Sequence, residues 1–568
     1  MMRTLNRKLL RDLWHVKGQA FAIAAVVACG VAIVVMTYGA MMSLRETRDA
    51  YYERYHFADV FSQLRRAPQR VASQIAAIPG VAALETRITH YAALDIPNLQ
   101  RPAAALLVSL PERGEQRLNR LALREGRLPL HGRDELVISE NMAQALHYQT
   151  GTHLSVLLNG RKRSFTVVGI ALSPEFVYTL PPGQLMADDK TFGILWIDGG
   201  ILAAAYDLDG AFNDVSVLLS PGASEPEVIR RLDALLSRYG GTVAYGRADQ
   251  ISNAYVDQEL DQLRTVALVI PPVFLAVAAF LINTVLSRLV DTERECIGLL
   301  KSFGYSNWEV GWHYLKFALA ITALGVVAGM GGGLLLGQWM TGMYQSYFRF
   351  PFLEYRIDPA VFSAAIFVSF TAAVAGTSTA VFRAVRLAPA IAMQPPAPTI
   401  YRRTLLDRLG LDRFISMPTQ MIFRHIERWP VRAAGTISGT AMAVMLLVGL
   451  FFFFDAIDEL IETFYFQANR QDVVIGLVDQ RGARAAFDIG HLTGIRAAEP
   501  VLEVPARLSS GHLSQRLGIV GLREGTHFRA FYDAAGRSFT LPKRGIVLSN
   551  KLADLLAVHS GDRVDVDV

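Results

Sequence analysis

The chemically most capable group of side chains in this sequence is a short, mixed-charge segment at residues 291–310. Its charged residues include the carboxylates Glu293 and Glu295 and the cations Arg294 and Lys301, set among apolar residues. Side chains of both signs on one short segment can form ion pairs and hydrogen bonds with a facing surface. The segment therefore suits docking into a cleft of another protein, although a solvated hairpin lying on lipid headgroups explains the charges equally well.

The sequence around these charges predicts two helices separated by a glycine. Ile297 and Leu300 recur at helical spacing, with charges on the opposite face. Gly304 then occupies the position where a left-handed residue ends a helix. Ser306 and Glu309 stand at capping-box spacing, which starts a new helix. We therefore expect a helix, a glycine stop and a second helix.

No catalytic motif accompanies this segment. The sequence holds neither a G-x-x-x-x-G-K-[ST] phosphate loop nor an H-E-x-x-H metal pair. The run Gly376-Thr377-Ser378-Thr379-Ala380 is similar to a nucleophile elbow, but it lies inside an apolar stretch without the strand-to-helix context of that motif, so we interpret it as helix packing. Since no ionisable residue lies deep in an apolar stretch, a proton or ion relay has no carriers. We expect a chain that is not an enzyme, has no cofactor or metal site, and is powered by another subunit.

The elements that must position the charged segment are membrane spans. The chain has 568 residues, a mean hydropathy of +0.27 and only 19% charged residues, which is too apolar for an ordinary soluble protein. Crossing about 30 Å of hydrocarbon takes roughly 20 apolar residues. Five stretches meet that requirement: residues 19–42, 265–286, 317–340, 360–382 and 433–454.

The basic residues predict the orientation of these spans. They are concentrated in residues 1–18, a predicted amphipathic helix, and in the linker at residues 383–432. The positive-inside rule places both segments, and the loop at 287–312, in the cytoplasm. Alternation then puts residues 43–263 and 455–568 outside. The same bias explains much of the net charge of +5, so no nucleic-acid partner is expected.

The first apolar block is interpreted as an uncleaved anchor. It is longer than the apolar region of a usual signal peptide, and no small-residue cleavage site follows it. With this topology Cys29 lies in a span and Cys296 in a cytoplasmic loop, so the two cysteines cannot pair. The outer domains must therefore be held together by packing alone.

The region from residue 43 to 263 reads as an α+β domain. Arg163–Ile170 has strand-like alternation with Gly169 as a glycine stop, and Glu225–Tyr239 has the spacing of an amphipathic helix. Between them, the prolines and glycine of Tyr178–Gln184 predict an irregular, aromatic loop. That loop is either a packed connector or a contact for a substrate or partner.

The third span carries glycine at every fourth position: Gly325, Gly329, Gly333 and Gly337. Glycine at this spacing forms a groove that lets another backbone approach closely. The alternative is that glycine is simply common in membrane helices, but four in register favour close helix packing.

The chain also contains an internal repeat. Leu136–Val156 returns without a gap as Ile546–Val566, with a strand-like run, a short helix and a glycine turn in the same order. The first copy is followed by three further spans. By the arithmetic of the repeat we expect about 240 residues of the second copy beyond Val568, so that this chain is C-terminally truncated.

Two segments carry a resemblance to a known family. Gly298–Ser306 is similar to the loop G-hydrophobic-L-K-A-hydrophobic-G-x-S of the FtsX-like permeases of ABC transporters, and Arg383–Ala390 resembles their basic exit from the fourth span. Arg428–Arg432 resembles the start of the second half in the two-repeat type, which is MacB-, LolC- and LolE-like. The resemblance covers essentially the whole chain. It implies a membrane helical bundle with α+β extracytoplasmic domains in two tandem repeats, the second incomplete.

The family likeness implies partners and site residues. A separate ABC ATP-binding subunit, which holds ATP and magnesium, would dock on the loop, and a periplasmic adaptor of the membrane-fusion type is a further candidate partner beside membrane lipid. Cys296 stands where the family often has glutamate or glutamine, and nearby acidic residues are candidates to replace that contact. The residues implied for docking are Glu293, Arg294, Glu295, Gly298, Leu299, Lys301, Phe303, Gly304, Tyr305 and Ser306.

Three functions are compatible with these expectations. The first is the permease of a type VII, mechanotransmitting ABC transporter that exports or extracts a substrate from a bacterial cytoplasmic (inner) membrane. The second is an FtsX-like mechanotransmitter that regulates an extracytoplasmic enzyme without transport. The third is a membrane-anchored scaffold without an ATPase, which requires the loop resemblance to be accidental. Two large outer domains favour the first.

Overall fold

The computed structural model describes residues 2–567 apart from residues 98, 100, 112–114, 183, 185–186, 387, 390–415, 429, 478–480, 483 and 534. The chain divides into two compact units. The helical unit consists of Met1–Thr47, Glu259–Ser346 and Leu353–Phe454, and the α+β unit of Arg48–Gln258, Tyr347–Phe352 and Asp455–Val568.

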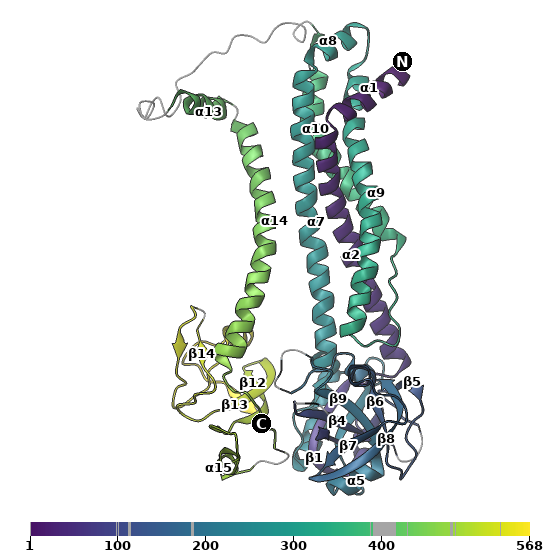
Figure 1. Cartoon of the computed structure of the whole chain (residues 1–568), viewed down its shortest axis with the longest axis vertical. Coiled ribbons are helices and arrows are strands. Elements are labelled where there is room, and N and C mark those ends of the chain that lie inside the picture. The colour runs from purple at the N-terminus through teal and green to yellow at the C-terminus, as the bar shows by residue number, and fades with distance from the viewer. Residues whose placement is uncertain are drawn as a thin grey trace. The chain divides into compact units, whose positions relative to one another are not determined.

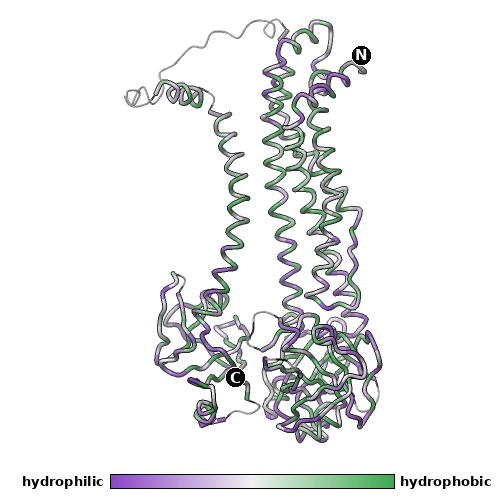
Figure 2. The backbone as a smooth tube through the Cα atoms, in the orientation of Figure 1, coloured by the Kyte–Doolittle hydropathy of each residue, from purple (hydrophilic) through white to green (hydrophobic). Residues whose placement is uncertain are grey.

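Long helices dominate the helical unit. Among the described residues, five helices are long and apolar enough to cross a membrane: α2, α7, α9, α10 and α14. Figure 2 shows apolar residues along their middle parts. The helices extend past the predicted spans at several ends, because polar residues continue the helical pattern there. The bounds are α1 Met2–His15, α2 Lys17–Arg54, α7 Ile251–Thr292, α8 Arg294–Ser302, α9 Asn307–Tyr347, α10 Pro359–Arg386, α13 Met417–Arg428 and α14 Pro430–Glu462 (Figure 1).

The first part of the α+β unit contains two sheets. A four-stranded sheet has the order β11-β1-β10-β2, and a seven-stranded sheet has the order β5-β8-β6-β9-β4-β3-β7. The helices are α3 Arg70–Ala76, α4 Glu140–Leu146, α5 Gly199–Tyr206 and α6 Glu225–Leu236. The strands are β1 Val60–Pro68, β2 Val81–Arg87, β3 Thr89–Asp95, β4 Ala103–Leu110, β5 Ala122–Gly126, β6 Glu135–Ser139, β7 His153–Leu158, β8 Arg161–Leu172, β9 Phe192–Asp198, β10 Ala211–Leu219 and β11 Tyr245–Gly246.

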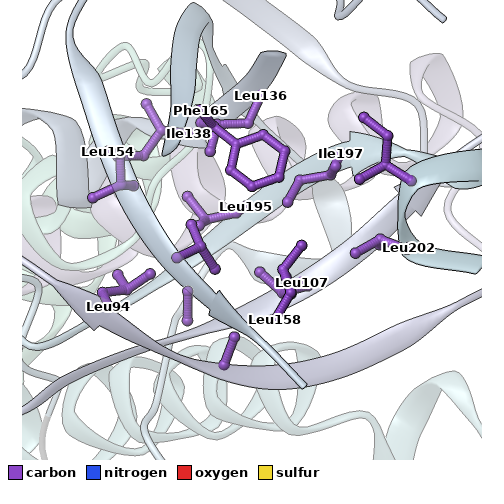
Figure 3. Close-up of a cluster of buried hydrophobic side chains, with 14 of the residues drawn as sticks. Leu94, Leu107, Leu136, Ile138, Leu154, Leu158, Phe165, Leu195, Ile197 and Leu202 are labelled. Carbon is purple, nitrogen blue, oxygen red and sulfur yellow. The ribbon is translucent and has the colours of Figure 1, made fainter. Parts of the chain in front are cut away.

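The larger sheet closes on itself through β8. The first half of this strand pairs antiparallel with β7, and its second half pairs in parallel with β6. Six strands thereby form a closed barrel, which leaves only β5 as an added edge. Figure 3 shows leucine and isoleucine side chains gathered around Phe165 in this core. Phe165 and Leu195 are fully buried there, so the barrel interior is packed with side chains.

Gly169 does not end its strand, as the sequence had suggested. β8 continues through it to Leu172. A Cβ at this position would lie 2.5 Å from the carbonyl oxygen of Arg127, on the segment that follows β5. The glycine therefore permits close approach of a neighbouring backbone, a role it can have without interrupting the strand.

A buried ionic network joins the two sheets. Arg87 at the end of β2 is bonded to Asp214 of β10 on its own sheet, at 2.7 Å, and to Glu175, which follows β8, at 2.6 Å. Asn119 donates a further bond to Glu175. Because Arg87 binds a carboxylate of its own sheet and another three residues after the end of β8, it ties the two sheets together within this domain.

The aromatic loop after β8 is packed. The Tyr178 ring lies 4.7 Å from that of Tyr255 and 5.9 Å from that of Phe348, and its backbone N–H donates to Ser252 Oγ. These contacts favour the connector interpretation of the loop. Gly183 lies outside the described residues.

The second outer domain repeats part of the first. Its helix α16 (Asn550–Leu556) has the same length as α4, and each helix ends in a left-handed residue, His147 with φ 56° and Ala557 with φ 50°. The sheet order β13-β12-β16 matches β4-β3-β7. The repeat read from the sequence is therefore also present in the backbone. Its elements are α15 Arg484–Gly490, β12 Leu502–Ser510, β13 Leu513–Gly521, β14 Phe531–Tyr532, β15 Ser538–Phe539, α16 and β16 Asp565–Asp567.

Candidate partner-docking site

Helix α8 forms the centre of the candidate site and ends in a complete glycine cap. The N–H of Tyr305 donates to the carbonyl of Leu300, and the N–H of Gly304 donates to that of Lys301. Gly304 has φ +91°, which an L side chain rarely adopts. Together these bonds form a Schellman motif, so the expected glycine stop is present.

Helix α9 starts immediately after this cap. Ser306 Oγ accepts a bond from the N–H of Glu309 at 3.2 Å, and the N–H of Ser306 donates to Glu309 Oε2 at 2.8 Å. This reciprocal pair confirms the capping box predicted from the spacing. The turn between α8 and α9 is thus fixed by backbone bonds at the end of α8 and by side-chain capping at the start of α9.

The inner face of α8 is anchored to neighbouring helices. Ile297 is fully buried in a cluster that includes Val310 of α9 and Ala384 of α10. Lys301 Nζ donates to the last carbonyls of α10, those of Ala384 and Val385, where a cation is favourable. Desolvation lowers the pKa of Lys301.

Glu293 was expected to face a docking partner, but its carboxylate is bonded within the helical unit. Both of its carboxylate oxygens lie 2.6 Å from Lys8 Nζ of α1, and it accepts a bond from the hydroxyl of Tyr314. Lys8 also bonds Asp12 at 2.6 Å. Burial lowers the pKa of Lys8, but Asp12 and Glu293 outweigh this effect, so the net pKa is raised. Glu293 therefore holds α1 against the start of α8.

The outer face of α8 is exposed. Leu299 is 44% exposed and Phe303 70% exposed, and both follow Glu295 at helical spacing. At the start of α9, Trp308 is 76% exposed and stacks on Trp312 with the ring centroids 6.2 Å apart. Sequence reasoning missed these tryptophans, although their i, i+4 spacing was a usable signal. The remaining predicted docking residues divide by burial: Glu295 and Ser306 are exposed, Arg294 and Tyr305 are half-buried, and Gly298 is buried.

Three of the four regularly spaced glycines of α9 contact α2. A Cβ at Gly325, Gly329 or Gly333 would lie 2.7 Å from atoms of α2. The contacted α2 atoms include the carbonyl oxygens of Ala24 and Ala28. The two helices therefore approach at backbone distance along this face, as in other small-residue interfaces.

Gly337 has a different neighbour. A Cβ there would overlap the ring of Tyr355, which lies in the segment between α9 and α10. The same ring covers Gly39 of α2, and its hydroxyl donates to the carbonyl of Val35 at 2.9 Å. The nearest neighbour of the last glycine is therefore an inserted tyrosine ring and not a helix backbone.

Other chemical candidates in the helical unit have structural roles. Gly376 packs on α7, since a Cβ there would lie 2.6 Å from the carbonyl of Ala279. Nearby, Thr379 donates to Asn283 of α7 at 2.7 Å. No cluster of His, Cys, Asp or Glu that could hold a metal occurs among the residues that the structure describes. Leu387, Ala390 and Trp429 of the family-like segments, and residues 391–415 of the linker, lie outside the described residues.

Two family models match the chain. The FtsX-like permease C-terminal model matches residues 268–389, which include α8 and α9. The MacB-like periplasmic core domain model matches residues 20–235, which include the barrel. No curated protein matches the chain.

Several solved structures are similar to parts of the chain. The periplasmic region of MacB from Actinobacillus actinomycetemcomitans has 12% identity and a TM-score of 0.24, covering 36% of this chain and 92% of that one. The extracellular domain of the noncanonic ABC-type transporter YknZ from Gram-positive bacteria has 13% identity and a TM-score of 0.22, covering 32% and 97%. A domain of a putative permease protein from Porphyromonas gingivalis has 16% identity and a TM-score of 0.20, covering 32% and 80%.

Proposed function

Because the chain is a multi-pass FtsX/MacB-like permease, we propose that it is the permease subunit of a type VII ABC transporter. A separate ATP-binding subunit hydrolyses ATP, and the permease converts that event into movement of its outer domains, which export or extract a substrate. The chain lies in a bacterial cytoplasmic membrane with its N-terminus in the cytoplasm. A periplasmic adaptor is a further candidate partner.

The observation that carries this proposal is the construction of α8. Its inner face packs on α9 and α10, and Lys301 is bonded to the end of α10. Leu299 and Phe303 on its outer side are exposed. Exposed apolar side chains on a rigid support are typical anchors of a protein interface. A subunit that binds them can therefore displace α8 together with the helices it contacts.

The close contact between α9 and α2 would transmit that displacement. Since Gly325, Gly329 and Gly333 contact α2 at backbone distance, α9 and α2 cannot shear past each other without steric clash. A force on α8 then moves this helix pair as one element. The substrate does not need to pass between these helices, because the outer domains perform the work.

Co-purification tests the docking role. Phe303→Asp and Leu299→Asp in the full chain should each lose the ATP-binding subunit, while Phe303→Leu, which keeps the surface apolar, should retain it. Because both side chains are exposed, all three variants, when expressed without the subunit, should keep the gel-filtration profile of the wild-type permease. Normal retention of the subunit by both aspartate variants would exclude α8 as the docking element.

The alternative function is mechanotransmission to an extracytoplasmic enzyme. Both functions use the same ATP-binding subunit and the same α8 surface. Proteins that co-purify with the outer domains distinguish them: an adaptor supports export, and a hydrolase supports regulation.

A further inference from the structure

Helix α1 has two chemically different faces. Its inner face carries Lys8 and Asp12, which are bonded to each other, and Lys8 is also bonded to Glu293. Its outer face carries Leu10, 69% exposed, and Trp14, 73% exposed, at i, i+4 spacing. The apolar outer side chains are thus unrelated to the contacts that hold α1 in place.

The charged side chains named on the outer face are both cations. Arg7 and Arg11 are exposed on it, next to Leu10 and Trp14. The only acid in α1 is Asp12, which is buried and paired with Lys8. No carboxylate of α1 therefore reduces the positive potential of the outer face.

The position of α1 in the chain brings this face to the membrane surface. Helix α2, which is long and apolar enough to span a bilayer, begins at Lys17, two residues after α1 ends. Lys17 Nζ lies 4.9 Å from the centroid of the Trp14 ring, which extends the cationic and aromatic strip into α2. Tryptophan and basic side chains in this arrangement are typical of helices that lie in the headgroup region.

We propose that the outer face of α1 binds anionic phospholipid headgroups. Arg7, Arg11 and Lys17 contact the phosphates, and Leu10 and Trp14 insert between the upper parts of the acyl chains. Because Lys8 on the opposite face bonds Glu293, the lipid-bound helix is connected directly to the start of α8. The proposal goes beyond the proposed function, since it requires neither transport nor an ATP-binding subunit.

Lipid selectivity of the full chain tests the proposal. The protein is reconstituted in phosphatidylcholine bilayers, and the immobilised fractions of spin-labelled phosphatidylglycerol and phosphatidylcholine are compared by electron paramagnetic resonance. The wild type should prefer phosphatidylglycerol, and R7Q/R11Q should lose at least half of that preference. Raising the salt concentration should reduce the wild-type preference toward that of the variant.

Two further variants test whether lipid selectivity depends on the outer face of α1 or on the overall charge of the protein. Arg101→Gln/Arg238→Gln removes two exposed cations of the outer domain and should leave the preference unchanged. Trp14→Ser should weaken immobilisation of both lipids. Unchanged selectivity in R7Q/R11Q would overturn the proposal, and loss of the ATP-binding subunit by R7Q/R11Q with unchanged lipid selectivity would assign the face to a protein partner instead.

Discussion

Lys8 and Glu293 lie 285 positions apart in the sequence, yet the ammonium of Lys8 is 2.6 Å from both carboxylate oxygens of Glu293. This pair joins the first helix of the chain to the residue that precedes α8. Both side chains are largely shielded from water, at 12% and 18% exposure. The element proposed to receive force from a partner is therefore also fixed to α1.

Removing either partner of this pair should destabilise the helical unit. Lys8→Met or Glu293→Gln leaves the other group poorly paired, at a cost of roughly 1 to 3 kcal/mol. Because the pKa of Lys8 is raised, the contribution of its charge is constant near neutral pH and is lost as the pH rises above about 10.4. Thermal stability in detergent measures the effect. Because Asp12 loses Lys8 in both variants, the double variant Lys8→Met/Glu293→Leu is compared with Lys8→Met and should be the more stable of the two. A double variant no more stable than Lys8→Met would contradict the pairing.

Close helix packing predicts a difference between two glycines of α9. Gly329→Ile places a branched side chain where even a Cβ would lie 2.7 Å from the carbonyl of Ala28, and should cost on the order of 1 to 2 kcal/mol. Gly332→Ile is the matched control, because nothing lies within 4 Å of a Cβ at Gly332. The two variants are compared by their melting temperatures in detergent. Similar melting temperatures would remove the evidence for a tight α2–α9 interface.

Local signals predicted the backbone around α8, but they did not predict its contacts. Gly304 and the Ser306–Glu309 pair act within a few residues, so their geometry follows from the sequence. The inward orientation of Glu293 depends on Lys8, which is remote in the chain. The same limit applies to Gly337: its spacing predicts a helix partner, while the structure places Tyr355 there.

The outer domain illustrates the same limit for sheets. Alternating apolar residues identified β8 as a strand, but closure of the barrel requires that one strand pairs with β7 along one half and with β6 along the other. Nothing in a single strand specifies two partners. The role of Gly169 could not be predicted from the sequence either, because it depends on the close approach of the Arg127 backbone.

The ionic network around Arg87 should be sensitive to partial removal. Arg87→Met leaves Glu175 and Asp214 as two buried, unpaired carboxylates, and breaking a buried pair costs about 3 to 5 kcal/mol. The triple variant Arg87→Met/Glu175→Gln/Asp214→Asn removes all three charges and should recover most of the stability. Limited proteolysis of the outer domain compares the stabilities of the two variants. Greater protease resistance in Arg87→Met than in the triple variant would contradict the network.

The contribution of Glu135 to the stability of the outer domain should depend on pH. Its bond with Arg127 lowers the pKa of Glu135 to about 2. A lowered folded-state pKa stabilises the fold above the unfolded pKa of about 4.3, and this contribution is lost as the pH falls toward the folded value. Glu135→Gln should therefore cost about 1 kcal/mol or less near pH 7, because Arg127 is half exposed. Thermal unfolding at about pH 7 and pH 3 should show the difference shrinking with acid, and a constant difference would contradict the assignment.

Ala557 offers a stabilising substitution in the second outer domain. It ends α16 with φ 50°, in the left-handed region, where an L residue is strained by roughly 1 to 2 kcal/mol and glycine is not. Ala557→Gly should therefore stabilise this domain by up to about 1 kcal/mol, after the greater chain entropy of glycine in the unfolded state is subtracted. Ala553→Gly is the matched control, since it makes the same change inside α16 and should destabilise by about 1 kcal/mol. Hydrogen exchange of the α16 amides reports both effects, with slower exchange expected for Ala557→Gly and faster exchange for Ala553→Gly. Faster exchange in both variants would mean that the left-handed cap does not strain Ala557.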